Sequence, residues 1–299
     1  MSRVRHVAVR CPGKVNLHLE VLGKRPDGYH ELRTLFAAVG VWDELVVTAA
    51  PAGVIELTVE PAGAVSAGGD NLVMRAARAA SAAWGVGAGA RIHLRKQIPV
   101  GGGMGGGSAD AAATLVGLAS VWDRPRSSVS MERLAETLGS DVPFFLVAGV
   151  AWGEGRGTEL RALADLPPWW LVLLPAEAPV STPEVYASLG LGPLGEVAES
   201  AVYDWSAGGG TLPLSACRND LEPAVVVRWP LVRTRLEALR RTDPLLAMVS
   251  GSGGTVFAVY PSEARARDEA ERLGSYRPLV APLLSRERSR LRPLVVEEA

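Results

Sequence analysis

The segment Val100–Ala113, VGGGMGGGSADAAA, constrains the fold more than any other part of this 299-residue chain. Six of the seven residues from Gly101 to Gly107 are glycine, which permits positive φ angles and lets a ligand approach the backbone closely. Residues 90–99 ahead of the loop alternate as a strand does. The alanine-rich run behind it, opened by the N-cap candidates Ser108 and Asp110, predicts a helix. A glycine loop at a helix N-terminus presents unpaired N–H groups, and phosphate is the anion that such a site usually binds.

Three known kinds of phosphate-binding loop are possible interpretations of this segment. A Walker A loop needs a lysine directly before the serine, and Gly107 precedes Ser108 instead. A dinucleotide oxidoreductase stays an alternative because the spacing G-x-G-x-x-G occurs, although Asp123 lies in a turn and not at the end of a second strand. The His-Arg-Asp and Asp-Phe-Gly motifs of protein kinases are missing from the sequence. A flexible linker is disfavoured, because a strand and a helix flank the loop so closely.

Composition narrows the class of protein. The chain is 48% hydrophobic and 21% charged with a net charge of −1, which is typical of a globular protein and gives no reason to expect nucleic acid or a membrane as partner. Two distant cysteines and an N-terminus without a long apolar stretch predict a cytoplasmic protein. The composition shifts around residues 166–170, LPPWW, so we expect two domains, residues 1–165 and 166–299.

Two short segments near the N-terminus carry candidate site residues. The strand pattern of residues 6–20 is interrupted at 11–13, which puts Lys14 and Asn16 on one side of the pleat, within reach of a phosphate or a reacting hydroxyl. An exposed lysine on an edge strand is the alternative. The turn Pro-Asp-Gly that follows delivers Tyr29 and His30 into a loop, where an aromatic ring beside an imidazole suits a heteroaromatic base. A lone histidine is nevertheless more often structural.

Three positions farther along are also candidates. Asn71 is a predicted helix cap, and the helix behind it is expected to bury Leu72, Ala76, Ala79 and Ala83. Lys96 ends the strand before the glycine loop, where a cation could meet a nucleotide phosphate. Asp141 stands between a helix end and the run Val-Pro-Phe-Phe, which predicts partial burial; beside a lysine its carboxylate would stay ionised as a base. The alternative for Asp141 is a capping role in the next turn.

Three ordered motifs resemble the GHMP kinase superfamily of small-molecule kinases: PGKVNLHLEVLG, IPVGGGMGGGSADAAA and MVSGSGGTVFAVY. Two more, RPDGYHELRTLF and LGSDVPFFLVAG, are similar to the branch that phosphorylates 4-(cytidine 5'-diphospho)-2-C-methyl-D-erythritol (CDP-ME). Together the motifs cover nearly the whole chain. The resemblance implies an α+β fold of two domains, an N-terminal α/β domain with a left-handed βαβ unit and a ferredoxin-like C-terminal domain, with the active site between them.

The resemblance also implies an activity and a set of roles. The activity is ATP-dependent phosphorylation of the 2-hydroxyl of CDP-ME, in the methylerythritol phosphate pathway to isoprenoid precursors, with Mg²⁺ as cofactor. Asp141 would be the catalytic base and Lys14 its partner, and Ser108 would contact the metal. The substrate pocket would comprise Asn16, Tyr29, His30, Thr182, Pro183 and Tyr186. The ATP site would comprise Asn71, Leu72, Lys96, Pro99, Val100, Gly101, Gly102, Gly103, Met104, Gly105, Gly106, Gly107, Ser108 and Ala109.

Three residues depart from the pattern of this branch. Cys11 stands where alanine is frequent, Asp110 where asparagine is frequent and Tyr186 where phenylalanine is frequent. None of the three removes a reacting group. A homoserine or mevalonate kinase is the nearest alternative, and such an enzyme needs no base-binding Tyr-His pair. A ligand sensor without catalysis is disfavoured because both Lys14 and Asp141 are present. The sequence leaves the oligomeric state open.

Overall fold

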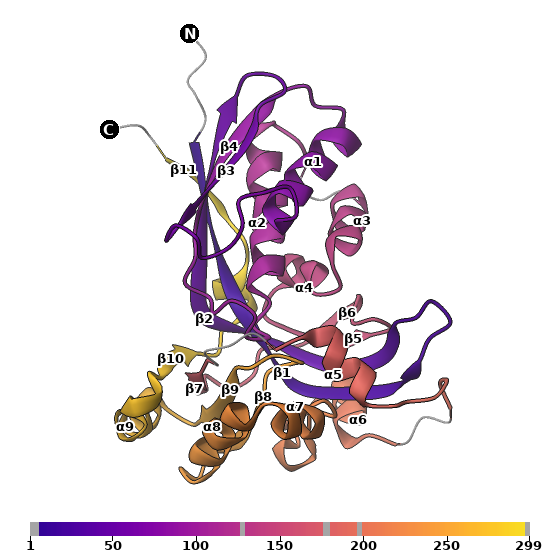
Figure 1. Ribbon diagram of the computed structural model, residues 1–299, viewed down its shortest axis with the longest axis vertical. Helices are drawn as coiled ribbons and strands as arrows, with labels where there is room; N and C mark the ends of the chain where they lie inside the picture. Colours follow the sequence, from indigo (N-terminus) through magenta and orange to yellow (C-terminus); the bar gives the residue numbers. More distant parts are fainter. Residues whose placement is uncertain (1–5, 126–128, 176–179, 196–198, 297–299) are drawn as a thin grey trace.

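A computed structural model of the chain describes residues 6–125, 129–175, 180–195 and 199–296. Over these residues the strands form two sheets, one of seven strands and one of four. The first sheet is built mainly from the first half of the chain and the second sheet from the second half, and both described ends lie in the first sheet (Figure 1).

The first sheet has the order β11-β1-β2-β4-β3, and β5 and β6 extend it from β2. Its strands are β1 (His6–Lys24), β2 (His30–Ala50), β3 (Ile55–Glu60), β4 (Gly89–Arg95), β5 (Val150–Glu154), β6 (Glu159–Ala162) and β11 (Pro293–Val296). One face carries α1 (Leu72–Trp84), α2 (Gly106–Val121), α3 (Val129–Leu138) and α4 (Val142–Val147) (Figure 1). β3 and β4 are parallel and α1 connects them, so they form a β-α-β unit. β11 pairs with β1, and the chain therefore returns to this sheet at its end.

The second sheet has the order β10-β7-β9-β8, with antiparallel neighbours throughout. Its strands are β7 (Trp170–Leu174), β8 (Leu246–Val249), β9 (Val256–Tyr260) and β10 (Leu279–Pro282). The helices of this half are α5 (Thr182–Ser188), α6 (Ala201–Gly208), α7 (Glu222–Arg228), α8 (Pro230–Arg240), α9 (Glu263–Arg272) and α10 (Arg286–Ser289), with short 3₁₀ turns at Leu214–Ala216 and Gly274–Tyr276. Helices between β7 and β8 and between β9 and β10 give the expected ferredoxin-like arrangement.

The hairpin of β1 and β2 joins the two halves (Figure 1). The pairing register shifts between Pro12 and Gly13, where the sequence predicted an interruption, and the strand continues through the bulge. A bulge bends a strand and re-aims the side chains behind it. Lys14 and Asn16 follow directly, so the local irregularity serves to place two candidate site residues. Beyond them Leu19 forms a bridge with Asn219 of the second half.

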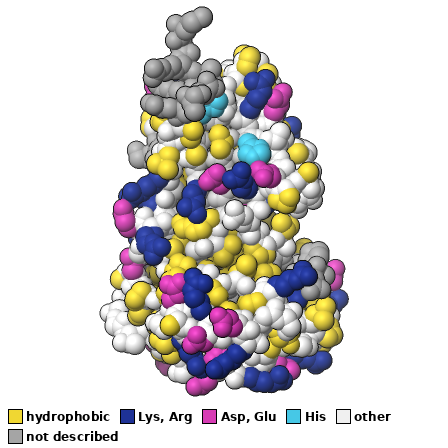
Figure 2. All heavy atoms as spheres, turned by 90° about the vertical axis from the view of Figure 1, so that its left-hand side faces the viewer, with side chains coloured by type: hydrophobic (Ala, Val, Ile, Leu, Met, Phe, Trp, Pro, Cys, Tyr) yellow, Lys and Arg dark blue, Asp and Glu magenta, His cyan; other side chains and the backbone are white. Residues whose placement is uncertain are grey.

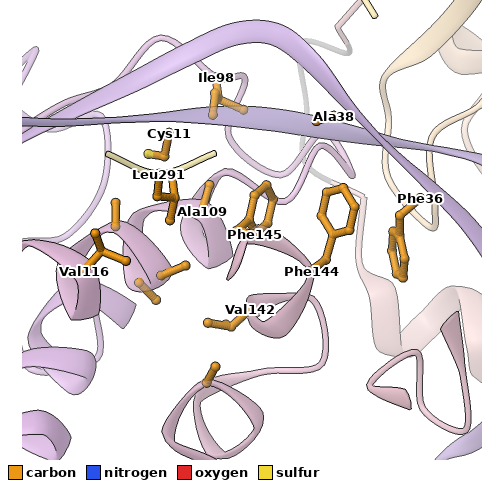
Figure 3. Close-up of a cluster of buried hydrophobic side chains, with 14 of the residues drawn as sticks. Cys11, Phe36, Ala38, Ile98, Ala109, Val116, Val142, Phe144, Phe145 and Leu291 are labelled. Carbon is orange, nitrogen blue, oxygen red and sulfur yellow. The ribbon is translucent and has the colours of Figure 1, made fainter. Parts of the chain in front are cut away.

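The main core lies between the first sheet and its helices. α2 is buried along almost its whole length, and its alanines and Gly117 allow this close contact: a Cβ on Gly117 would lie 2.8 Å from a methyl group of Val47. Phe144 and Phe145 of α4 extend the core toward Phe36 of β2, and the rings of Phe36 and Phe144 are 5.0 Å apart (Figure 3). The other face of the sheet is exposed and carries ion pairs such as Arg91–Glu56. On this side of the molecule, charges of both signs mix with apolar groups (Figure 2).

The predicted inner face of α1 was correct in part: Ala76 is buried and Leu72 is half-buried against the core, whereas Ala79 is only half-buried. Ala83 is exposed, and the buried residues are Val73, Met74, Ala76, Ala77 and Ala80. In a run so rich in alanine, the helical period leaves two neighbouring faces almost equally apolar, and the packing against α2 and α3 decides between them. The capping prediction was correct, because the side chain of Asn71 accepts a hydrogen bond from Val73 N.

Candidate active site

A cleft of about 1060 Å³ is lined by residues of both halves of the chain. The sequence-predicted residues that line it are Lys14, Asn16, Tyr29, His30, Asn71, Leu72, Lys96, Pro99, Val100, Gly101, Gly102, Gly103, Met104, Gly105, Gly106, Gly107, Ser108, Asp141, Thr182, Pro183 and Tyr186. Ala109 lies elsewhere, fully buried in the core below the loop (Figure 3). Residues that sequence analysis did not assign also line the cleft, among them Arg156, Gly251 and Ser252.

The glycine loop is held by the third motif of the sequence. Gly101, Gly103 and Gly105 have φ angles of 70°, 75° and 68°, which explains the glycine at these positions. The Ser250 hydroxyl donates to the carbonyl of Gly103 at 3.0 Å, and Thr255 N donates to the carbonyl of Gly102 at 3.1 Å. The motif around residue 250 could have indicated such a role, since its glycines allow two loops to approach with their backbones in contact.

α2 begins three residues earlier than a cap at Ser108 would place it. Gly105 occupies the N-cap position in the left-handed conformation, so Ser108 and Asp110 lie within the helix and do not cap it. Because the first N–H groups of a helix have no partner inside it, the first turn of α2 offers donors at the wall of the cleft. Ser108 also lines the cleft. The first turn of α2 therefore lines the cleft as expected, with a different helix start, and its binding of an anion stays a prediction.

Lys14 and Asp141 meet at the centre of the cleft wall. Lys14 Nζ lies 3.3 Å from Asp141 Oδ2 and donates to Asn16 Oδ1 at 2.7 Å. The Lys14 side chain is 4% exposed, whereas that of Asp141 is 34% exposed and so remains open to a ligand. Asp141 stands at the N-cap position of α4, yet its side chain caps no described backbone N–H. The geometry favours a role in the cleft over the capping alternative.

The strand with Lys14 is also tied to the glycine loop. Lys14 N donates to the carbonyl of Met104 at 2.9 Å. A Cβ on Gly105 would lie 3.1 Å from Lys14 Cγ and 2.9 Å from the ring of Phe145. Loop, lysine and α4 are therefore packed in direct contact.

Aromatic rings also line the cleft. The rings of His30 and Tyr186 are 4.9 Å apart at an angle of 30°. Tyr29, which the sequence pairs with His30, is 53% exposed, and the Arg156 guanidinium lies 4.6 Å from its ring centre. Burial, with a contribution from Lys24, lowers the pKa of His30, so its imidazole is neutral at pH 7. A neutral imidazole presents one donor and one acceptor, as a base-binding group requires.

Lys96 lies at the wall of the cleft with its charge already compensated. Its ammonium contacts Asp43 and donates to Asp110 Oδ2 at 2.8 Å, and its side chain is 4% exposed. Asp43 also accepts hydrogen bonds from the backbone N–H of Gln97 and of Ile98. Burial lowers the pKa of Lys96, but the two carboxylates outweigh it and leave that pKa above its ordinary value. The cation expected to meet a phosphate thus also ties β2, β4 and α2 together.

Asp110 is a weak acid in this buried group. Burial raises its pKa to about 7; the ammonium of Lys96 opposes this rise and the charge of Asp43 adds to it. One cation cannot neutralise two carboxylates in a low-dielectric interior, which is why one of them holds a proton near neutral pH. Cys11 Sγ donates to Asp110 Oδ1 at 3.6 Å, so the two residues that depart from the family pattern here are in contact.

This group predicts a pH-dependent stability. The folded chain keeps a proton on Asp110 that the unfolded chain loses near pH 3.8. The free energy of unfolding therefore decreases as pH rises from about 4 to about 7. Asp110→Asn removes the titration. We expect the melting temperature of the variant, relative to wild type, to increase between about pH 5 and about pH 8. Asp268→Asn, an exposed site on α9, is the control for the same change of charge. A relative decrease for Asp110→Asn would contradict the raised pKa.

Comparisons with known proteins show the family of this chain. Residues 71–149 match the family described as GHMP kinases N terminal domain, and residues 204–278 match GHMP kinases C terminal. The 4-diphosphocytidyl-2-C-methyl-D-erythritol kinase of Pelotomaculum thermopropionicum is 44% identical over 261 residues, 87% of this chain and 91% of the relative. The enzyme of that name from Halorhodospira halophila is 40% identical, over 97% of this chain and 96% of the relative.

Solved structures are similar to this chain as well and indicate the same kinase family. A crystal structure of 4-(cytidine 5'-diphospho)-2C-methyl-D-erythritol kinase matches with a TM-score of 0.75 and 35% identity, covering 92% of this chain and 98% of the other. The homoserine kinase of Cytophaga hutchinsonii, at 18% identity and a TM-score of 0.73, shares the fold. These findings confirm the α+β kinase fold and the resemblance on which it was predicted. No helix in the described parts of the chain has the length and apolar character needed to cross a membrane. The chain belongs to the 4-diphosphocytidyl-2-C-methyl-D-erythritol kinases, a family of GHMP-type small-molecule kinases.

Proposed function

We propose that this protein transfers the γ-phosphoryl group of ATP to the 2-hydroxyl of CDP-ME, in the pathway that forms isoprenoid precursors from methylerythritol phosphate. The observation that carries the proposal is the position of the Lys14–Asp141 pair, 3.3 Å apart, in the wall of a cleft shared with the glycine loop and the His30–Tyr186 ring pair. The loop suits a triphosphate, the rings suit a nucleobase, and the acid lies where the two ligands would meet.

We divide the cleft between the two substrates. ATP would occupy the side formed by the glycine loop, the start of α2 and Asn71, Leu72 and Lys96, with its phosphates on the N–H groups of the first helical turn. CDP-ME would occupy the other side, with Asn16, Tyr29, Thr182 and Pro183 around it and its cytosine against His30 and Tyr186. Thr182 Oγ1 and Ser252 Oγ are 2.7 Å apart, which gives this side a contact from the third motif.

The reaction needs few reacting side chains. The 2-hydroxyl oxygen forms a bond to the γ-phosphorus while the bond from that phosphorus to the bridging oxygen breaks, which leaves ADP. The hydroxyl proton passes to the Asp141 carboxylate. Lys14 orients that carboxylate and stabilises negative charge on the group in transfer. Positioning and electrostatics supply most of the acceleration of phosphoryl transfer, and the direct contact between loop, Lys14 and α4 suits this task.

We propose Mg²⁺ as the metal that accompanies ATP. The described residues hold no cluster of three His, Cys, Asp or Glu side chains suited to a metal ion. Mg²⁺ usually takes one or two ligands from a protein and the others from phosphates and water, so the residues of the cleft fit a metal that arrives with the nucleotide. Ser108 would be the contact from this chain. When bound, the ion neutralises charge on the β- and γ-phosphates.

The test is the release of ADP with a panel of acceptors. CDP-ME, mevalonate, homoserine and galactose are offered at equal concentration, and ³¹P NMR of the product locates the new phosphate. We expect turnover with CDP-ME and a phosphate ester at carbon 2. Turnover with homoserine or mevalonate and none with CDP-ME would replace the proposed substrate. Absence of ADP release, together with tight NADH binding, would favour the dinucleotide alternative.

Recognition of cytosine gives a second expected result. His30→Ala leaves polar groups of the base without a partner and removes the ring that lies against Tyr186, so we expect the KM for CDP-ME to increase by about 5–150-fold, the equivalent of about 1–3 kcal/mol. The KM for ATP should stay within about twofold, because His30 lies in the part of the cleft that we assign to CDP-ME. Equal increases for both substrates would show that His30 serves the fold.

We also propose that the chain divides into two domains, residues 1–165 and 166–299, and that the protein is cytoplasmic. The boundary between residues 165 and 166 falls between β6 and β7, and the return of β11 to the first sheet adds the last residues to the N-terminal unit in space. Both cysteines are free, which supports a reducing compartment, the cytoplasm.

A further inference from the structure

A chain of buried hydrogen bonds lies behind the Lys14–Asp141 pair. Lys14 Nζ donates to Asn16 Oδ1 at 2.7 Å, and Asn16 Nδ2 donates to the Thr34 hydroxyl oxygen at 2.7 Å. The Thr34 hydroxyl in turn donates to the backbone carbonyl of His18 at 2.8 Å. Asn16 and Thr34 are each 1% exposed. Water therefore cannot easily replace any partner in this chain.

The donors and acceptors of this chain can point in one direction only. A carbonyl accepts and never donates, so the hydroxyl proton of Thr34 must point at His18, and a lone pair of Thr34 faces Asn16. The amide of Asn16 must then present its NH₂ to Thr34 and its oxygen to Lys14. An ammonium only donates, so the opposite end of the chain requires the same orientation. A flipped amide would set donors against each other at Lys14.

Thr34 itself is held firmly. It lies in β2 between two paired strands, opposite Leu19 of β1 on one side and Gly153 of β5 on the other. The register of β1 and β2 shifts between Asn16 and His18, and this second irregularity lets one threonine reach both an amide and a carbonyl of the neighbouring strand. A Cβ on Gly153 would lie 3.2 Å from the Thr34 methyl group, so the glycine leaves room for the side chain.

We propose that Thr34 is a positioning residue for phosphoryl transfer: its hydroxyl fixes the orientation of the Asn16 amide, and the amide oxygen holds Lys14 Nζ against Asp141. The inference rests on the proposed function for the roles of Lys14 and Asp141. Without the hydroxyl, the amide loses its buried acceptor and rotates, and Lys14 loses the oxygen that holds it. Thr34 itself is buried and is not among the residues that line the cleft.

The first test compares variants that differ at the hydroxyl. Thr34→Val keeps the branched shape and removes the oxygen, whereas Thr34→Ser keeps the oxygen. We expect kcat to fall by about 10–100-fold in Thr34→Val, since misplacing a catalytic group by about 1 Å costs up to about 10²-fold. The KM for ATP should stay within about twofold, and Thr34→Ser should keep kcat within about threefold of wild type. Thr114→Val, which removes another buried hydroxyl that bonds a backbone carbonyl, is the control.

The second test asks whether Thr34 acts through Asn16. In a double-mutant cycle, Thr34→Val should have almost no further effect on kcat in an Asn16→Ala background, because the group it orients is gone. Additive losses would overturn the inference, as would an unchanged kcat in Thr34→Val. If Thr34→Val does not fold, the pair Thr34→Ala and Thr34→Ser tests the same oxygen.

A third readout is independent of activity. A crystal structure of Thr34→Val should show the Asn16 amide rotated and Lys14 Nζ farther from Asp141 Oδ2 than 3.3 Å. An unchanged Lys14–Asp141 contact there would overturn the inference even if the acceptor panel supports the kinase activity. If the panel identifies another acceptor, the same variants are measured with that acceptor, so failure of the proposed substrate and failure of the role of Thr34 give different results.

Discussion

Asp141→Asn is expected to lower kcat by about 10²–10⁴-fold, the range that general-base assistance typically contributes. Asparagine keeps the shape of the side chain and one oxygen for Lys14 Nζ, but its amide cannot take a proton from the substrate hydroxyl. Both substrates should still bind with KM values within a few-fold of wild type, because the lost interaction belongs to the transition state. Steady-state ADP release with CDP-ME gives kcat and both KM values.

Two controls make this result interpretable. Asp268→Asn changes the same charge on the exposed surface of α9 and should leave kcat unchanged. Single-turnover measurements show whether chemistry or product release limits the wild-type rate, because a slow release would hide part of the effect. A folded Asp141→Asn enzyme that keeps a single-turnover rate within about threefold of wild type would exclude Asp141 as the base.

The sequence predicted the parts of the site better than their contacts. The glycine loop, Lys14 and Asp141 all line one cleft, because motif residues at strand and helix ends have local causes that a sequence displays. The family resemblance put His30 and Tyr186 in one pocket, but their ring contact does not follow from local spacing, since 156 positions separate the two residues. Local spacing therefore identifies candidate residues, and tertiary packing selects their partners.

Local spacing also did not predict the partners of the charged residues. Lys96 was predicted from its position before the loop, but nothing local indicated that Asp43 and Asp110 would both bind its ammonium. Asp110 was a good cap by propensity, but α2 begins at Gly106 with Gly105 as its N-cap, so Asp110 lies inside the helix. Its carboxylate instead binds the ammonium of Lys96. Lys96 and Asp110 were both recognised from the sequence, but the ion pair between them was not.

The contact between the glycine loop and the third motif predicts a second large effect. A Cβ on Gly103 would lie 2.0 Å from the carbonyl oxygen of Ser250 and 3.0 Å from Gly253 N. These neighbours are backbone atoms, so a rotamer change cannot relieve the overlap. The φ angle of 75° adds strain for any residue with a Cβ. Gly103→Ala must therefore separate the two loops and break the hydrogen bonds from Ser250 and Thr255.

We expect Gly103→Ala to raise the KM for ATP by about 10²-fold or more, because two hydrogen bonds of about 1 kcal/mol each and about 1–2 kcal/mol of backbone strain add to about 3–4 kcal/mol. The melting temperature should fall as well, since the contact joins the two halves. Gly87→Ala adds a methyl group where nothing lies within 4 Å, and it serves as the control for expression and stability.

Gly253→Ala tests the same contact from the other half of the chain. A Cβ there would lie 2.2 Å from Gly103 N, although Gly253 is separated from the loop by 150 positions. We expect the same loss of ATP affinity, and a double variant little worse than either single one, because one separation of the loops relieves both overlaps. Titration with a fluorescent ATP analogue measures the affinity directly. Wild-type affinity in a folded Gly103→Ala protein would show that the loop binds nucleotide without support from the second half, and additive losses would show that the two glycines act at different contacts.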